Sequence, residues 1–262
     1  MKIGLALGGG IARGLAHIGV LQALTELGVE INILAGTSSG SIIGALFATG
    51  YPPSAIEEIA HTTTWRDLGH LVVPRRSLLG ADRMEQSLEA LLRGKTFADL
   101  EMPFAAVCTD LLRAEKVALT SGPVSLAVRA SCSIPGIFPP VEWEDRLLID
   151  GGTVENVPVQ TVRQMGADLV IGVDLYSDIA PVERVEGIMG VLTRSLEISQ
   201  RYRCLTEFQT ADVCIEPLLA GESLVDLSRV EVYIKAGYEA TMAQQKALLE
   251  LKQKLVPVAL GS

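Results

Sequence analysis

Residues 31–56 carry no charged side chain, and this stretch restricts the possible folds of the chain more than any other. A run of this length could cross a membrane as one helix. However, the polar turn 36-GTSSG-40 divides it, and Pro52 and Pro53 close it. A strand over residues 31–35 followed by a helix over 39–50 accounts for both interruptions. We therefore predict a buried strand–turn–helix unit and not a transmembrane helix.

The beginning of the chain shows the same pattern. Residues 2–7 predict a short buried strand, glycines occupy positions 8–10, and a helix is predicted from about residue 13 to 27, with Gly28 ending it. Two strand–turn–helix units in succession indicate a parallel sheet with crossover helices. A chain of 262 residues with 48% hydrophobic residues suits one medium-sized α/β domain.

The rest of the chain continues the alternation of strands and helices. Apolar runs bounded by Gly, Pro and Asp predict strands over residues 104–110, 116–120, 146–150 and 168–174. Helical patterns cover residues 54–100, 188–208 and 229–255. In the last of these, Leu248, Leu251 and Leu255 would share one face. We expect that face to pack on the core, with a partner or a membrane surface as the alternative.

Charge and cysteine content exclude several classes of protein. The net charge of −9 lacks the basic footprint of a nucleic-acid-binding protein and argues against general attraction to anionic membranes. A local apolar patch could still dock on a lipid surface. The four cysteines are scattered without a C-x-x-C pair, so we expect buried thiols in a reducing cytosol and neither a zinc ribbon nor a dithiol site.

The turn 36-GTSSG-40 has the G-x-S-x-G pattern of a nucleophilic serine. Gly36 and Gly40 would allow a tight strand-to-helix turn with strained backbone angles, which would expose the Ser38 hydroxyl at a sheet edge. The helix dipole at that position favours a developing oxyanion. The predicted strand before the turn and the predicted helix after it supply the required context. A Gly/Ser-rich turn without chemistry remains the alternative.

The glycine cluster 8-GGGIARG-14 also joins a strand to a helix. It lacks the dinucleotide-binding fingerprint, because the third glycine of that motif would fall on Arg13. The sequence 94-GKT-96 lacks the first glycine of a P-loop, because position 89 is Glu. Adjacent glycines could instead offer backbone N–H groups as an oxyanion hole, with Arg13 steadying the loop or adding positive potential. A plain tight turn is the alternative.

A serine nucleophile needs a base, and histidine is a poor candidate here. No strand-end acid precedes His61 or His70, and His17 lies inside the first predicted helix, where packing or a local hydrogen bond is expected. Asp150 ends the apolar strand 147-LLID-150 and enters a Gly-Gly turn, which places it at a sheet edge. Asp110 and Asp174 end strands in the same way, although strand capping or turn formation explains them as well.

Taken together, these motifs resemble the patatin-like phospholipase family, particularly its bacterial members. Four stretches match in the family's order: 8-GGGIARGLAHIGVL-21, 36-GTSSGSIIGALFATG-50, 130-ASCSIPGIFPPV-141 and 150-DGGTVENVPV-159. The resemblance extends more loosely over most of residues 1–217. It implies a three-layer α/β/α fold with a mostly parallel central sheet. We expect a single domain, with a core over residues 1–217 and a helical extension over 218–262 packed on it.

The resemblance also implies a Ser-Asp dyad, with Ser38 as nucleophile and Asp150 as base. The N–H groups of the loop Gly8, Gly9, Gly10 and Ile11 would form the oxyanion hole, with Arg13 as its basic residue. Gly36, Gly40, Gly151 and Gly152 are the remaining motif glycines. Many bacterial members have a fourth glycine where this chain has Ile11, and we expect that side chain to face the core. The family uses no metal or organic cofactor for this chemistry.

The implied activity is hydrolysis of a phospholipid, a lysophospholipid or a related acyl ester. We expect a cytoplasmic protein with a lipid substrate, transient contact with a membrane surface and no nucleic-acid partner; the sequence is silent on oligomeric state. Residues 65–80 could form a flap over the site, or an ordinary packed surface helix and loop. The alternative function is a lipid-responsive regulator or adaptor that keeps the fold with little hydrolysis.

Overall fold

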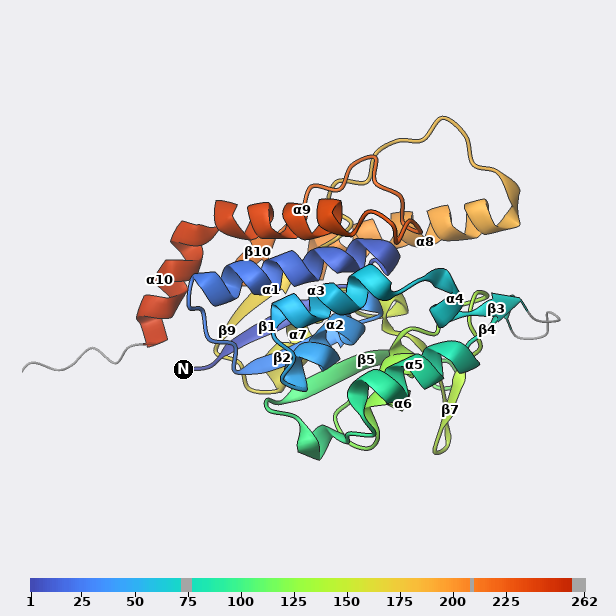
Figure 1. Ribbon diagram of the computed structural model, residues 1–262, viewed down its shortest axis with the longest axis horizontal. Helices are drawn as coiled ribbons and strands as arrows, with labels where there is room; N and C mark the ends of the chain where they lie inside the picture. The colour runs from blue at the N-terminus through green and yellow to red at the C-terminus, as the bar shows by residue number, and fades with distance from the viewer. Residues whose placement is uncertain (72–76, 208–209, 256–262) are drawn as a thin grey trace, which may run out of the picture.

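The computed structural model describes residues 1–71, 77–207 and 210–255 (Figure 1). Its main sheet has the strand order β10-β9-β1-β2-β5-β8-β7, and β6 pairs with β5. These strands are β1 (Ile3–Leu7), β2 (Ile33–Thr37), β5 (Phe104–Asp110), β6 (Glu115–Leu119), β7 (Val141–Trp143), β8 (Arg146–Asp150), β9 (Leu169–Val173) and β10 (Val213–Ile215). The run from β10 to β5 is parallel, whereas β6, β7 and β8 pair in antiparallel fashion.

The helices surround this sheet. They are α1 (Ala16–Glu26), α2 (Ser39–Ala48), α3 (Pro53–Thr62), α4 (Trp65–Leu68), α5 (Asp82–Leu92), α6 (Val124–Ser131), α7 (Val159–Gln164), α8 (Gly187–Glu207), α9 (Val230–Ala243) and α10 (Gln245–Leu255). Short 3-10 helices occupy η1 (Ile11–Leu15), η2 (Phe97–Asp99) and η3 (Gly151–Thr153). A small hairpin, β3 (His70–Leu71) and β4 (Leu79–Gly80), stands apart from the main sheet.

The central strands β1, β2, β5 and β9 are buried on both faces, as the predicted three-layer α/β/α fold requires. In β1, Ile3, Leu5 and Leu7 pack into the cluster that contains α1, α2 and α9, whereas Ala6 packs into a second cluster with residues of α7 and α8. This alternation is the period of two that a strand imposes on its side chains. In Figure 1, α9 runs beside α1 above the sheet.

The contact between α1 and α9 is close because both helices carry a glycine at it. A Cβ atom on Gly19 would lie 1.8 Å from the Ile234 carbonyl oxygen, and one on Gly237 would lie 1.9 Å from the Ala16 carbonyl oxygen. No larger residue fits at either position without moving a helix. The contact joins a helix near the N-terminus to one in the last part of the chain.

Several predicted elements differ from the structure. The strand predicted over 31–35 is shifted and lies at Ile33–Thr37. The single helix predicted over 229–255 is wrong, because the chain breaks at Gln244 into α9 and α10. Within α10, Leu248 and Leu251 are buried as expected; the side chain of Leu255 lies outside the described part. The region predicted as helical over 54–100 also contains the β3–β4 hairpin.

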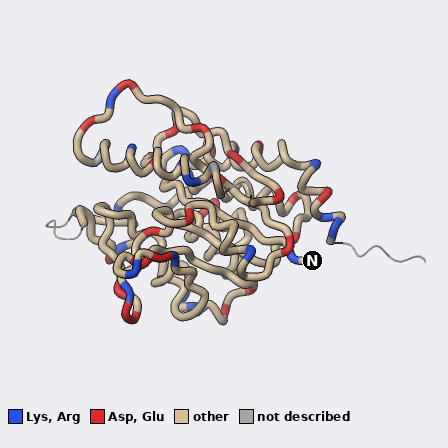
Figure 2. Tube along the Cα trace, turned by 180° about the vertical axis from the view of Figure 1, so that it is seen from behind, with Lys and Arg blue, Asp and Glu red and all other residues tan. Residues whose placement is uncertain are grey.

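The stretch 31–56 forms the predicted strand, turn and helix as β2 and α2. Among the described residues, no helix combines the length and the apolar character needed to span a bilayer. Lys and Arg are interspersed with Asp and Glu along the trace (Figure 2). Cys108, Cys132 and Cys204 are buried, and Cys214 is half-buried.

Candidate active site

The site forms where two strands meet end to end beside a third. β2 runs along one edge of β5 as far as the pair Thr37–Val107. The next residue of β5, Cys108, pairs with Asp150, the last residue of the antiparallel strand β8. β6 occupies the opposite edge of β5 along this stretch, so β2 and β8 share one edge. This register brings Ser38, which follows β2, next to Asp150.

Ser38 forms the sharp turn between β2 and α2. Its backbone has φ 53° and ψ −126°, a left-handed conformation that is strained for a residue with a side chain. Its N–H donates to Ser131 Oγ at 2.9 Å, and that hydroxyl donates to the Val107 carbonyl at 2.6 Å. The Ser38 carbonyl accepts from the N–H and hydroxyl of Ser41, at 2.8 and 2.6 Å. These bonds hold the serine in the strained turn at the N-terminus of α2.

The glycines on either side of this turn are needed because a side chain at either position would clash with neighbouring backbone. The strained backbone angles occur at Ser38 and not at these glycines. A Cβ atom on Gly36 would lie 2.4 Å from the Gly40 carbonyl oxygen. One on Gly40 would lie 2.2 Å from the Leu7 carbonyl oxygen. Neither glycine has a positive φ. The G-x-S-x-G spacing is therefore required by close packing of α2 against the ends of β1 and β2.

Asp150 lies in a dry environment beside Ser38. It is 7% exposed, and burial raises the pKa of its carboxyl group to about 6. Hydrogen bonds from the Ser38 side chain and from the Gly152 N–H oppose this rise in pKa; the Gly152 bond is 2.8 Å long. Gly151 is required by packing, since its Cβ would lie 2.2 Å from the Val107 carbonyl oxygen. A carboxylate with this pKa is a stronger base than an exposed aspartate.

The glycine loop follows β1 at the same edge of the sheet, but not all of its N–H groups are available. The N–H of Gly8 donates to the Val173 carbonyl at 3.1 Å, and that of Gly9 to the Asn156 carbonyl at 3.3 Å. Within the described residues, the N–H groups of Gly10 and Ile11 have no acceptor. Of the four N–H groups predicted as oxyanion donors, only these two are therefore available to a ligand in the described chain.

Ile11 does not face the core as expected. Its φ is 53°, a rare value for a β-branched residue, and its half-buried side chain lines the space next to Ser38. A glycine, which the family resemblance leads us to expect at this position, would adopt this φ without steric strain.

Arg13 and His17 are buried side chains next to the glycine loop. Arg13 is 4% exposed and donates to the carbonyls of Leu175 and Glu222, at 3.2 and 3.1 Å. These bonds are compatible with the first of its two predicted roles, steadying the loop, which stays a prediction. His17 Nε2 lies 2.7 Å from the Gly8 carbonyl oxygen, and burial lowers the pKa of the ring to about 4. His17 is therefore a neutral donor to the loop.

The other predicted candidates have structural roles. Asp110 accepts from the Leu112 N–H and pairs with Arg113, both at 2.9 Å. Asp174 accepts from the Tyr176 N–H at 2.9 Å, so both acids form turns. His61 lies 3.9 Å from Glu57 and from Glu231 at the surface. In the described chain, no histidine bonds Ser38 or Asp150.

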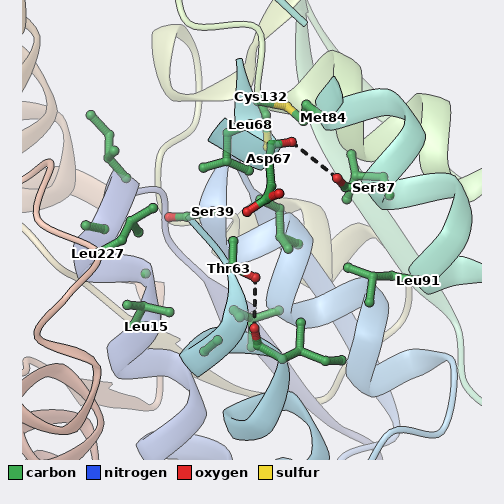
Figure 3. A pocket seen from close by; sticks show the side chains of 18 of the residues that line it. Leu15, Ser39, Thr63, Asp67, Leu68, Met84, Ser87, Leu91, Cys132 and Leu227 are labelled. Atoms are coloured by element: carbon green, nitrogen blue, oxygen red, sulfur yellow. Dashed lines mark hydrogen bonds between the residues drawn. The ribbon is translucent and has the colours of Figure 1, made fainter. Parts of the chain in front are cut away.

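A cavity of about 420 Å³ opens at Ser38 and runs between α2, α3, α4 and α5. Its lining is mainly apolar, and it includes Leu15, Leu46, Leu68, Met84 and Leu91. Figure 3 shows such side chains converging from η1, α4 and α5, with Cys132 at one side. Trp65 and Leu68 of α4 contribute one wall. Part of the stretch 65–80, for which a flap and a packed surface helix and loop were the two alternatives, therefore borders the cavity, while residues 72–76 lie outside the described chain.

A second, smaller cavity of about 30 Å³ opens on the other side of Ser38. It is lined by Asp150 and by the uncharged polar residues Thr153, Asn156, Tyr176, Thr193 and Gln200, with apolar residues beside them. Ile11, Ser38 and Ile134 border both cavities. Ser38 therefore lies at the junction of an apolar space and a more polar one.

Three residues of the site escaped prediction from the sequence. Ser131 lies within the matched stretch 130-ASCSIPGIFPPV-141, and Asn156 lies within 150-DGGTVENVPV-159, so both carried a signal. Gln200 lies in α8, outside the matched stretches, and no sequence motif pointed to it. No cluster of three metal-ligating side chains occurs among the residues that the structure describes.

Comparison with known proteins finds a family and several relatives that are similar to this chain in sequence. The model of the family described as patatin-like phospholipase matches residues 5–163. An uncharacterized NTE family protein of Mycobacterium tuberculosis is 39% identical over 192 residues, which cover 71% of this chain and 52% of the relative. A second uncharacterized NTE family protein of the same species is 30% identical over 276 residues. This alignment covers 95% of this chain and 47% of the relative. The chain thus spans about half the length of these relatives.

Solved structures share the fold at low sequence identity. VipD from Legionella pneumophila superposes with a TM-score of 0.57 at 13% identity, covering 94% of this chain and 66% of VipD. The type III effector protein ExoU gives a TM-score of 0.51 at 16% identity, covering 95% of this chain and 53% of ExoU. The family model spans the glycine loop, the Ser38 turn and Asp150, and on these grounds the chain belongs to the patatin-like phospholipase family.

Proposed function

We propose that this protein hydrolyses acyl esters of lipids through a Ser-Asp dyad. The observation that carries the proposal is the end-to-end meeting of β2 and β8 on one edge of β5. It places a strained serine beside a buried carboxylate whose pKa is raised to about 6. Ser38 borders the larger apolar cavity, which can hold a substrate, and Asp150 lines the smaller cavity beside it.

Each group has a definite part in the proposed reaction. Asp150 accepts the proton of the Ser38 hydroxyl as the oxygen attacks the acyl carbonyl, and the ester oxygen leaves as an alcohol after protonation. The N–H groups of Gly10 and Ile11 stabilise the negative oxygen of the tetrahedral intermediate. Water then attacks the acyl-enzyme, which releases the fatty acid and restores Ser38.

The apolar cavity would hold the acyl chain. An engineered apolar cavity of about 150 Å³ can hold one benzene molecule. The cavity of about 420 Å³ is nearly three times as large, so it has room for an acyl chain of medium length. A lipid substrate fits this wall of aliphatic side chains better than a short or polar acid does.

Replacing Ser38 by Ala tests the assignment directly. We expect the Ser38→Ala variant to lose hydrolysis of p-nitrophenyl butyrate by at least about a thousandfold, because no other group can form the acyl-enzyme. Ser54→Ala, at an exposed position of α3, is the matched control and should keep full activity. Turnover at the level of the unchanged protein in a folded Ser38→Ala variant would refute the proposal.

A fluorophosphonate probe separates the enzyme from a lipid-binding regulator or adaptor. The probe labels a serine only if that serine is activated as a nucleophile. We expect labelling of the full chain at Ser38, located by mass spectrometry, and none in the Ser38→Ala variant. A folded sample that binds lipid and resists labelling would favour the regulator.

A further inference from the structure

The side of α8 that faces solvent carries no charge among its described side chains. Ile188 is 86% exposed and Tyr202 is 69% exposed, and Val191 and Ile198 are exposed as well. The other exposed side chains of this helix bear hydroxyl groups: Ser195, Ser199 and Thr206. A helix on the surface of a soluble protein normally turns charged side chains to water, so α8 departs from the usual pattern.

The apolar residues on this side form one continuous stripe. Positions 188, 191, 195, 198 and 202 follow the spacing i, i+3, i+7, i+10 and i+14, which places them on one face of a helix. At the rise of an α-helix, the stripe is about 21 Å long. We call these five residues, Ile188, Val191, Ser195, Ile198 and Tyr202, the α8 stripe.

The charged side chains of α8 that the structure describes are turned toward the protein. Arg194 pairs with Glu197 at 2.9 Å, and Arg201 donates to the Ser177 carbonyl at 2.6 Å. Arg203 likewise donates to a backbone carbonyl. The helix thus bonds its charges on the inner side and leaves apolar groups outside. A contiguous exposed apolar surface of this kind indicates a place of contact with another body.

The opposite face of α8 belongs to the candidate active site. Thr193, Leu196 and Gln200 line the small cavity next to Ser38. The stripe is therefore separated from the site only by the thickness of this helix, about 10 Å. A surface that covers the stripe would lie close to the reacting groups.

Other exposed apolar residues occur at the same end of the sheet. Val182 and Val185 lie in the loop between β9 and α8, which arches away from the core (Figure 1). Leu218 and Val225 follow β10. Because β9 and β10 are parallel to β1 and β2, their carboxyl ends share the sheet edge at which Ser38 follows β2. Exposed apolar groups therefore accompany the site.

We propose that the α8 stripe docks on the surface of a zwitterionic lipid bilayer, with the helix axis along that surface. The inference rests on the proposed function, since a lipid ester has to pass from a bilayer to the cavity at Ser38. An uncharged stripe on a chain of net charge −9 has nothing to attract anionic head groups, so apolar burial supplies the binding. Tyrosine suits the boundary between head groups and acyl chains.

A second copy of the chain is the competing occupant of the stripe. Two copies could pair this face with itself around a two-fold axis. Such pairing would bring two strongly acidic molecules together, whereas a zwitterionic bilayer has no net charge to repel the protein. The charge balance therefore favours the lipid surface.

Sedimentation with phosphatidylcholine vesicles tests the docking, on the full chain with Ser38→Ala to prevent hydrolysis. We expect Ile188→Asp combined with Val191→Asp to weaken binding at least about tenfold, because two exposed apolar contacts become charged. Val232→Asp, at an exposed apolar position of α9, is the matched control and should bind like the parent protein. Equal binding by both variants would overturn the proposal. So would binding that needs added phosphatidylglycerol and is lost at about 0.5 M NaCl.

A fluorescent label provides a readout that does not depend on a disruptive variant. Ser195→Cys carrying an environment-sensitive fluorophore should shift its emission to the blue when phosphatidylcholine vesicles are added. The same label on Ser54→Cys, at an exposed position of α3, should not shift. A shift that follows protein concentration without vesicles, together with elution as a dimer, would assign the stripe to a second copy and overturn the proposal.

Kinetics separate this proposal from the dyad. With Ser38 present, the ratio of hydrolysis of p-nitrophenyl myristate in phosphatidylcholine vesicles to that of dissolved p-nitrophenyl butyrate should fall at least about tenfold in the double variant. Ser38-dependent butyrate hydrolysis without vesicle binding would leave the dyad standing and reject the lipid surface. Vesicle binding that depends on the stripe, without Ser38-dependent hydrolysis, would reject the dyad and keep the stripe as a lipid-binding surface.

Discussion

At the scale of single residues, the raised pKa of Asp150 predicts the pH dependence of hydrolysis. A general base must be ionised, so kcat/KM should rise with pH through an apparent pKa of about 6 and fall away below it. His17 cannot produce this acidic limb of the pH–rate profile, the fall in kcat/KM below about pH 6, because burial lowers its pKa to about 4. The measurement is a pH–rate profile of p-nitrophenyl butyrate hydrolysis. The limb should persist in the His61→Gln and His70→Gln variants, and its loss in either would assign it to that histidine.

Ser131 acts through Ser38 and is therefore a positioning residue. Ser131→Ala should leave the buried Ser38 N–H without an acceptor, at a cost of about 1–3 kcal/mol. With that restraint lost, the strained turn can relax, so we expect kcat to fall about tenfold or more while KM changes little. Ser125→Ala is the matched control: it removes another buried hydroxyl of α6, which bonds Glu89 at 2.5 Å. A similar fall in kcat for both variants would indicate general loss of structure.

At the scale of elements, long apolar runs were predictable and short ones were not. β5 and β8 have the predicted bounds because their apolar residues form continuous runs between turn residues. β7 and β10 have three residues each and depend on pairing with a neighbouring strand, which leaves no local pattern to detect. α6 and α7 were missed for the same reason, since short helices depend on tertiary packing.

The candidate site shows the same division between local and non-local information. Ser38 and Asp150 could be singled out as candidates because Ser38 directly follows a strand and Asp150 ends one, each within a recognisable motif. Their proximity, and the bonds made by Ser131, depend on β2 and β8 sharing one edge of β5. Gln200 belongs to a helix far along the chain, and only the packing of α8 brings it to the site. The outward orientation of Ile11 depends on its backbone angle, which the sequence alone did not reveal.

The helices around the apolar cavity predict how acyl-chain preference can be altered. Ala60 of α3 lines the cavity and is 7% exposed. Ala60→Phe should occupy part of the space, so the optimum acyl length in a p-nitrophenyl ester series should become shorter by several carbons. Glu58→Phe, on the exposed side of α3, is the control and should keep the original optimum. An unchanged optimum in a folded Ala60→Phe variant would place the acyl chain elsewhere.

At the scale of the whole molecule, the last part of the chain supports the site through α1. α9 packs against α1 at Gly19 and Gly237. α1 carries His17, which holds the glycine loop at the Gly8 carbonyl. The loop in turn supplies the N–H groups proposed for the oxyanion hole. Displacing α9 should therefore affect stability first and the geometry of the loop second.

Two helical glycines provide a matched test of this support. A methyl group on Gly237 would lie 1.9 Å from the Ala16 carbonyl oxygen, so Gly237→Ala must push α9 away from α1. We expect a loss of about 1–3 kcal/mol in the free energy of unfolding, measured by urea denaturation, with slower labelling of Ser38 by a fluorophosphonate. Gly190 lies in α8, where a Cβ would meet its nearest atom at 3.4 Å. Gly190→Ala should be neutral or stabilising by up to about 1 kcal/mol, because alanine favours helices. If Gly237→Ala proved as stable as Gly190→Ala, the α1–α9 contact would not be the close packing that supports the loop.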